Sequence, residues 1–102
     1  MGKVSVIATM TCKDGKADAF PAAFDEFFRH VETEDGTESY VLHRSTTNPN
    51  VFYMTELYRD QGAFEAHSGS DAMAKLGGSL GEYIQDFDLQ VAEPVKAKGS
   101  GG

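Results

Sequence analysis

The sequence has a single cysteine, no tryptophan and no long apolar run. Cys12 alone can form neither an internal disulfide nor a thiolate metal cluster. No apolar stretch approaches the roughly 20 residues that a membrane helix needs, and the N-terminus lacks the pattern of a signal peptide. We therefore expect a cytoplasmic protein that does not enter a membrane.

Positive charge is also scarce. The chain has 9 Lys and Arg residues against 16 Asp and Glu residues, a formal net charge of −7. Nucleic acid and anionic membrane surfaces both present an unfavourable field to an acidic protein. The charge balance excludes both from the expected partners.

The chain has the size and composition of one globular domain. It has 102 residues, of which 40% are hydrophobic and 11% aromatic, an ordinary composition for a modest core. We place the domain at residues 1–94. Residues 96–102 offer no apolar anchor, so we expect a flexible tail at 95–102.

Residues 51–58 are the stretch around which the chain is organised. Their β-branched and aromatic side chains predict a strand. Because side chains alternate between the two faces of a strand, Phe52, Met54, Glu56 and Tyr58 should share one face. One carboxylate is therefore expected in line with large apolar groups.

A helix should follow this strand directly. Asp60 can cap its N-terminus, and Phe64 and His67 are three residues apart on one helical side. An acid and an imidazole among aromatic side chains are a candidate site.

Three further segments alternate apolar and polar residues and predict strands at 3–12, 38–45 and 87–91. The turn-forming residues at 46–50 join the strand at 38–45 to the strand at 51–58. We expect these two strands to form an antiparallel hairpin.

Two other regions carry apolar residues at helical spacing. The first begins near Phe20 and admits Pro21 in its opening turn. We expect it to end near Glu34-Asp35-Gly36, where Gly36 is free to adopt a positive φ. The second, at 71–84, holds three glycines that each weaken a helix by up to about 1 kcal/mol. We expect this second region to be irregular.

The order strand, helix, strand, strand, helix, strand predicts an α+β fold of the ferredoxin-like, split β-α-β type. Its antiparallel sheet carries both helices on one face. The other face, with Tyr53 and Leu57, needs cover that no remaining element supplies. We therefore expect a homodimer that pairs through this face about a two-fold axis.

Three motifs in this order and spacing resemble the antibiotic biosynthesis monooxygenase family, and the likeness covers about residues 3–92. They are Glu34-x-Gly36-x-x-x-Tyr40-x-Leu42, Pro49-x-x-Phe52-x-x-x-Glu56-x-Tyr58 and Ala63-x-x-x-His67-x-x-Ser70. The resemblance implies a dimeric α+β barrel with a pocket between sheet and helices in each subunit. It also implies that some members oxidise quinol or polycyclic substrates with O₂ and no metal, flavin or haem. Relatives that degrade haem carry a Trp near the position of His67, and the lack of Trp here argues against that activity.

A cofactor-free oxygenase needs a substrate that gives up an electron easily, because direct reaction of O₂ with an organic molecule is spin-restricted. Removing a proton from a quinol or phenol achieves this and requires a base in a dry pocket. His67 is the candidate base, since its unperturbed pKa of about 6.5 lies near neutrality, with Glu56 orienting it. Glu56 is itself the base if burial raises its pKa. Five aromatic residues are candidates for contact with a flat substrate: Tyr40, Phe52, Tyr58, Phe24 and Phe64.

Each candidate also has a structural explanation. His67 can be a core histidine bonded to a backbone carbonyl, and Glu56 can pair with Arg44 or Arg59. No metal or other cofactor is expected, because His43, His67 and Glu56 lie on three separate elements without ligand spacing. The alternative function is a non-oxidative use of the same pocket, as an isomerase of a small carbonyl compound or as a small-molecule binding protein.

Overall fold

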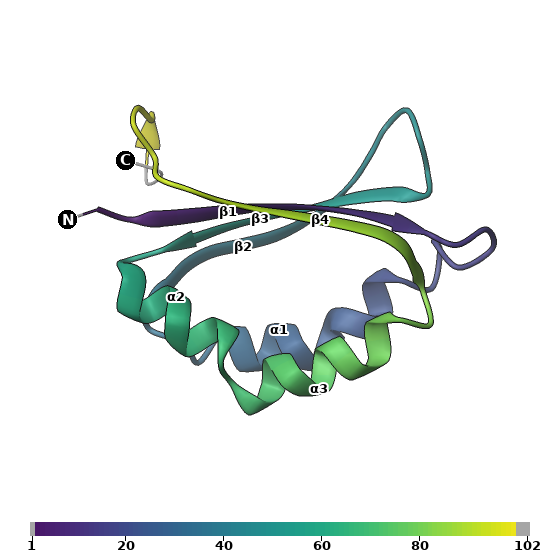
Figure 1. Ribbon diagram of the computed structural model, residues 1–102, viewed down its shortest axis with the longest axis horizontal. Helices are drawn as coiled ribbons and strands as arrows, with labels where there is room; N and C mark the ends of the chain where they lie inside the picture. The colour runs from purple at the N-terminus through teal and green to yellow at the C-terminus, as the bar shows by residue number, and fades with distance from the viewer. Residues whose placement is uncertain (1, 100–102) are drawn as a thin grey trace.

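A computed structural model describes residues 2–99. It contains one antiparallel sheet in the order β2-β3-β1-β4, with all the helices against one face (Figure 1). The strands are β1 (Val4–Cys12), β2 (Thr37–Arg44), β3 (Val51–Tyr58) and β4 (Ile84–Ala92). The helices are a short 3₁₀ helix, η1 (Pro21–Phe24), and three α-helices, α1 (Asp25–Val31), α2 (Gln61–Ser68) and α3 (Asp71–Leu80). The expected α+β, ferredoxin-like split β-α-β fold is confirmed.

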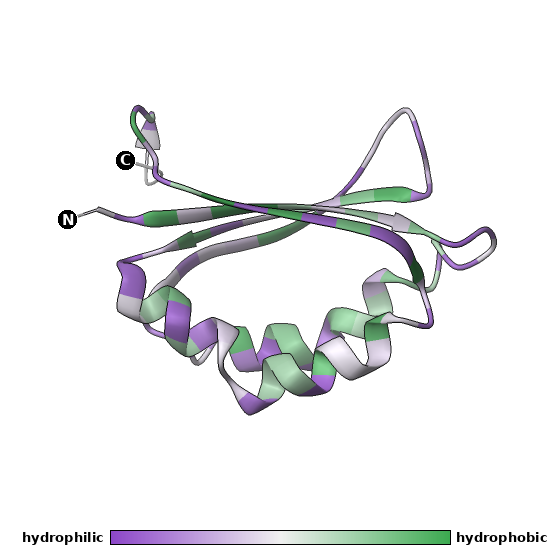
Figure 2. Cartoon of the chain, in the orientation of Figure 1, coloured by the Kyte–Doolittle hydropathy of each residue, from purple (hydrophilic) through white to green (hydrophobic). Residues whose placement is uncertain are grey.

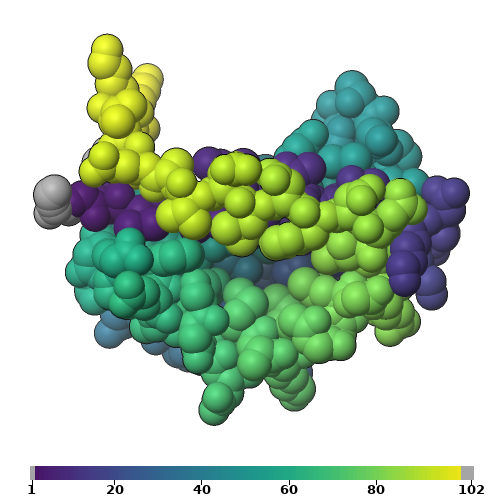
Figure 3. Space-filling model, in the orientation of Figure 1, coloured from purple at the N-terminus to yellow at the C-terminus, as the bar shows by residue number. Residues whose placement is uncertain are grey.

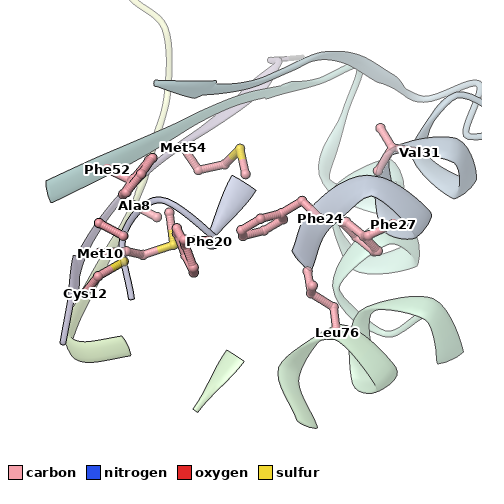
Figure 4. Close-up of a cluster of buried hydrophobic side chains, with 11 residues drawn as sticks. Ala8, Met10, Cys12, Phe20, Phe24, Phe27, Val31, Phe52, Met54 and Leu76 are labelled. Carbon is pink, nitrogen blue, oxygen red and sulfur yellow. The ribbon is translucent and has the colours of Figure 1, made fainter. Parts of the chain in front are cut away.

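The core lies between the sheet and the helices (Figure 4). The alternate residues of β1 that face the helices are all buried, as are Phe52 and Met54 on β3. Aromatic side chains of η1 and α1 cover them, and the rings of Phe20 and Phe52 lie 5.0 Å apart between centroids. The expected strand at 51–58 and the face assigned to its residues are confirmed.

The first helical region differs from the expectation. It opens with η1, in which Pro21 occupies the first turn as expected, and α1 ends at Val31 rather than near Gly36. Gly36 does not have a positive φ, since within residues 2–99 only Gly15 and Gly99 do. The N–H groups of Thr33 and Glu34 bond back to carbonyls of α1 in successive turns, so the chain reverses without a left-handed residue.

Gly36 is needed for a close approach instead. A Cβ at this position would lie 2.4 Å from the Cβ of Ala63 on α2, and the carbonyl of Gly36 accepts a hydrogen bond from the N–H of Arg59 at 2.8 Å. The absence of a side chain therefore lets the α1–β2 loop lie directly against α2. This contact holds the loop next to the helix that carries His67.

We expect Gly36→Ala to lower the free energy of unfolding by about 1–3 kcal/mol, the usual cost of overpacking. The Cβ of Ala63 is fixed to its backbone and has no rotamer that relieves the clash. Urea unfolding measures the change. Gly78→Ala is the control, because this exposed position on α3 has nothing within 4 Å and should gain up to about 1 kcal/mol. No loss of stability in Gly36→Ala would contradict the close approach.

The cap of α2 is the one expected from the sequence, and α3 is capped in the same way. Asp60 accepts a hydrogen bond from the N–H of Ala63 at 2.8 Å, and Ser70 accepts one from the N–H of Met73 at 3.1 Å. The expectation of an irregular second region is wrong for residues 71–80, because α3 is continuous through Gly77 and Gly78. Gly81 follows the end of the helix, and Ile84 begins β4 instead of continuing it. Packing of the helix on the core outweighs its weak propensity.

One edge of the sheet is less completely covered. Phe87, Leu89 and Val91 of β4 pair in register with inward residues of β1, yet they are 57%, 44% and 53% exposed. Hydrophobic and hydrophilic residues alternate along this strand in Figure 2. The helices therefore leave an apolar opening beside β4.

The outer face of the sheet has no helix over it within residues 2–99 (Figure 1). Ile7, Val41 and Tyr53 are 42%, 41% and 39% exposed there, whereas Leu57 is buried within the chain.

None of the helices in the described part of the chain is long and apolar enough to cross a bilayer. The domain limits at 1–94, the flexible tail at 95–102 and the cytoplasmic location stay predictions. Residues 1 and 100–102 lie outside the described residues.

Candidate active site

His67 lies on α2 in a pocket formed by three other elements. Its side chain is 2% exposed. The ring of His67 contacts those of Phe27, Tyr40 and Tyr58, which come from α1, β2 and β3, with centroids 5.4, 5.2 and 5.1 Å away. These rings exclude water from the imidazole and hold its orientation.

Glu34, which the sequence analysis did not select, is the closest polar partner of His67. The Glu34 Oε1 atom lies 2.8 Å from His67 Nδ1 and also accepts a hydrogen bond from the Thr37 hydroxyl at 2.8 Å. The other carboxylate oxygen, Oε2, lies 3.1 Å from His30 Nε2. Glu34 is the first residue of the first family-like motif, and that position is the sequence signal that could have identified it as a site residue. The local pattern around it indicates only the end of a helix.

The other side of the imidazole faces Glu56. His67 Nε2 is 4.0 Å from Glu56 Oε1 and, alone among the side-chain N and O atoms described, is buried with no hydrogen-bond partner. Since an ionised Glu34 can only accept, we assign the imidazole hydrogen to Nδ1. The Nε2 atom then carries a lone pair that accepts no hydrogen bond, and its neighbour is Glu56.

Glu56 is a carboxylate in a largely dry environment. Burial raises its pKa above the ordinary value, and the charge on Glu34 adds to this, while the hydrogen bond from the Tyr58 hydroxyl and the nearby His67 oppose it. Burial likewise raises the pKa of the Tyr40 and Tyr58 hydroxyls. Both tyrosines therefore remain neutral hydrogen-bond donors at physiological pH.

Glu56 lines an apolar cavity of about 390 Å³. Figure 3 shows the molecular surface hollowed between β4 and the helices. Residues of the sheet and of the helices line the cavity together. The strand residues are Ala8, Met10, Tyr40, Met54, Glu56, Ile84, Phe87 and Leu89, and the residues in or next to the helices are Phe24, Met73, Leu76, Gly77, Leu80 and Gly81. Glu56 is the one charged side chain among these lining residues.

Three of the sequence-predicted residues thus line the cavity: Glu56, Tyr40 and Phe24. Glu56 contacts neither of the arginines considered as its partner, because Arg44 pairs with Asp18 and Arg59 with Asp60. The partners of Glu56 are Tyr58 and His67.

The other four predicted residues do not line the cavity. His67 lies behind Glu56 and donates to Glu34 rather than to a backbone carbonyl. Tyr58 is fully buried and donates to Glu56, while Phe64 packs on Tyr58 with 5.4 Å between ring centroids. Phe52 belongs to the core, between Phe20 and the guanidinium of Arg44.

The raised pKa of Glu56 predicts a pH-dependent stability. Because the folded state holds this proton more tightly than the unfolded state, the contribution is fully present below the ordinary pKa of 4.5 and is lost as pH rises through the raised pKa. The free energy of unfolding of the wild type should therefore fall relative to Glu56→Gln across that window, by at most about 1.4 kcal/mol per pH unit. Urea unfolding of both proteins at several pH values measures the difference. A difference that does not change with pH would contradict the raised pKa.

In the described part of the chain, no group of three or more His, Cys, Asp or Glu side chains is arranged to hold a metal ion. Glu56, Tyr58, Tyr40 and His67 offer proton donors and acceptors beside an apolar cavity. What the site can do chemically is take a proton from a bound molecule and hold that molecule away from water.

Comparison with known proteins adds a family and several solved folds. The family model described as antibiotic biosynthesis monooxygenase matches residues 3–76. A Caulobacter crescentus structure, named as a putative antibiotic biosynthesis monooxygenase, is 28% identical with a TM-score of 0.86, covering 93% of this chain and 92% of that one. The structure of Rv0793 from Mycobacterium tuberculosis is 26% identical with a TM-score of 0.83, covering 93% and 97%. No curated protein matches the chain.

Proposed function

Because the chain belongs to the antibiotic biosynthesis monooxygenase family, we propose that it is a cofactor-independent monooxygenase that oxidises a quinol or polycyclic phenol with O₂. The observation that carries this proposal is a single carboxylate, Glu56, in the lining of an otherwise uncharged cavity. A cavity of about 390 Å³ lies within the range of small-molecule sites, about 300–1,000 Å³.

Glu56 is the base in this proposal, and His67 supports it from behind. Glu56 lines the cavity and His67 does not, so the geometry favours Glu56 over His67 as the base. A raised pKa makes a carboxylate a stronger base toward a phenol. Tyr40, which lines the same cavity, is a neutral donor that can stabilise the phenolate.

The reaction balances without a cofactor. Glu56 takes the hydroxyl proton of the substrate, and the anion passes one electron to O₂. The two radicals combine in a C–O bond, and the resulting peroxide takes the proton back from Glu56. The carbon then loses its hydrogen as the O–O bond breaks, which leaves one oxygen atom as a carbonyl and releases the other as water. The apolar walls keep water from the anion.

Oxygen consumption tests the proposal. We would incubate chelator-treated, flavin-free protein with a panel of reduced quinols and hydroxylated polycyclics, and subtract autoxidation of each compound. Uptake that depends on substrate and is lost in Glu56→Gln is expected. Binding without uptake across the panel would contradict the proposal and favour the isomerase or binding protein.

We also propose that the protein is a homodimer through the outer face of the sheet. Ile7 and Val41 both pair with Thr55, and Tyr53 pairs with His43 on the adjacent row. These exposed apolar side chains lie next to one another on a face without a helix, and a second copy would cover them about a two-fold axis.

Replacing Tyr53 by a charged residue should break this dimer. Tyr53→Glu places a carboxylate in the centre of the interface, where a desolvated charge without a partner is strongly unfavourable. Light scattering should give twice the chain mass for the wild type and the chain mass for the variant. Val95→Glu, at a position 86% exposed, is the control and should remain dimeric. A monomeric wild type would exclude the assembly.

A further inference from the structure

A row of titratable side chains joins Glu56 to the surface on the side away from the cavity. His67 Nε2 lies 4.0 Å from Glu56 Oε1, and His67 Nδ1 lies 2.8 Å from Glu34 Oε1. Glu34 Oε2 is 3.1 Å from His30 Nε2, and the His30 side chain is 39% exposed. Four residues from α1, the α1–β2 loop, α2 and β3 thus form one continuous row.

The row ends in a groove that is distinct from the cavity. His30, Glu34 and His67 line this groove, beside the close contact of Gly36 with Ala63. Glu56 lines the cavity, and no residue lines both. Glu34 and His67 therefore connect Glu56, which lines the apolar cavity, with the groove.

We propose that Glu56 exchanges its proton with solvent through His67 and Glu34 into this groove while substrate fills the cavity. This inference rests on the proposed function, since it concerns the base of that reaction. It makes Glu34 and His30 positioning and proton-transfer residues that do not touch the substrate.

The need for such a path follows from the position of Glu56. A substrate in the cavity replaces its water with apolar surface, so until the peroxide forms the cavity offers no acceptor for a proton leaving Glu56. The hydroxyls of Tyr40 and Tyr58 are the other titratable groups facing this site, and burial raises the pKa of each. Neither tyrosine can therefore take the proton. The unpartnered Nε2 atom of His67 can.

The transfer conserves protons and charge. The Glu56 O–H bond breaks as Nε2 gains the hydrogen, and the Nδ1 hydrogen passes to Glu34 and on to His30 or water. Glu56 is then free to take the substrate's hydroxyl proton. After the peroxide has taken the proton from Glu56, a proton from solvent returns along the same row, reprotonates Glu56 and restores the Nδ1–H imidazole. Hydrogen bonds to nitrogen span about 2.7–3.2 Å, so the 4.0 Å gap must close by about 1 Å during the transfer.

The test separates proton transfer from oxidation by excluding O₂. We would mix the protein with 2-naphthol under anaerobic conditions and follow naphtholate by its absorbance and released protons by a pH indicator. Wild type should release one proton per naphtholate, at the same rate. In Glu34→Gln both rates should fall at least about tenfold. The final amounts of naphtholate and of released protons should be no smaller than those of wild type. His30→Gln should be slowed less and be restored by added imidazole.

Glu32→Gln is the matched control, because it removes an exposed carboxylate two residues from Glu34 and should leave both rates unchanged. Wild-type rates in Glu34→Gln would overturn the proposal, and so would a lower amount of bound naphthol, which would indicate a purely structural role. Admitting O₂ afterwards tests the function separately. If bound naphtholate forms but is not oxidised, the oxygenase proposal fails and the proton path stands. If wild type binds no naphthol, both fail.

Discussion

Glu56→Gln is expected to lower kcat by a factor of about 10²–10⁴, the range for loss of a general base. This corresponds to about 3–5 kcal/mol of barrier. Glutamine has the same shape and its carbonyl can still accept the hydrogen bond from Tyr58, so the cavity should keep its form. Steady-state kinetics should show a loss in kcat with substrate affinity within a few-fold of wild type.

Two controls make this result specific to Glu56. Glu65→Gln removes an exposed carboxylate from α2, where its recorded contact is with Gln61, and should leave kcat unchanged. Glu56→Gln should also unfold at no lower urea concentration than wild type near neutral pH, because it removes a buried charge. Retention of wild-type kcat in a folded Glu56→Gln would exclude this residue as the base.

His67→Ala is expected to lower the free energy of unfolding by about 2–4 kcal/mol, from the cavity it leaves and the donor that Glu34 loses. Its ring contacts three aromatic side chains. The variant should also lose most of its activity, because nothing then connects Glu56 with Glu34. Thermal unfolding and oxygen uptake measure the two effects.

His67→Asn separates the two roles of this imidazole. The asparagine amide can still donate to Glu34 from near the Nδ1 position, but it places no lone pair at the Nε2 position facing Glu56. We expect stability to recover in part while activity does not. Recovery of both would show that His67 acts only as a structural donor.

The sequence predicts on which face of β3 Glu56 lies, but it does not predict which residues of that face line the cavity. Alternation on β3 places Phe52, Met54, Glu56 and Tyr58 on one face, as observed. It does not say which of them a helix covers. Phe52 lies under η1 in the core, whereas Met54 and Glu56 reach the cavity that opens toward β4. That difference depends on how the helices lie across the sheet.

Glu34 could not be found from local patterns, because its partner is 33 residues away in the chain. At the end of a helical segment, a glutamate is ordinarily solvated. The contact depends on the close packing of Gly36 against Ala63, which brings the loop to α2. From the sequence alone, a left-handed turn is the expected reason for a glycine at position 36, because glycine is most often required for that conformation.

In α3, local helix propensity predicts less order than the structure shows. Summed propensity predicts a broken helix, but Leu76 is buried in the core and α3 runs to Leu80. Packing on an apolar face contributes more than the few kcal/mol that glycine removes. The strand β4 then begins at Ile84, where the helical periodicity suggested a continuation.

Isotope labelling determines whether the protein transfers one atom of O₂ to its substrate. Wild-type protein without metal or flavin would be supplied with ¹⁸O₂ and whichever substrate of the panel gives uptake, and the product analysed by mass spectrometry. The account predicts one labelled oxygen atom in each product molecule, the other label in water, and no labelled product from Glu56→Gln. Product without label, formed together with hydrogen peroxide, would contradict a monooxygenase.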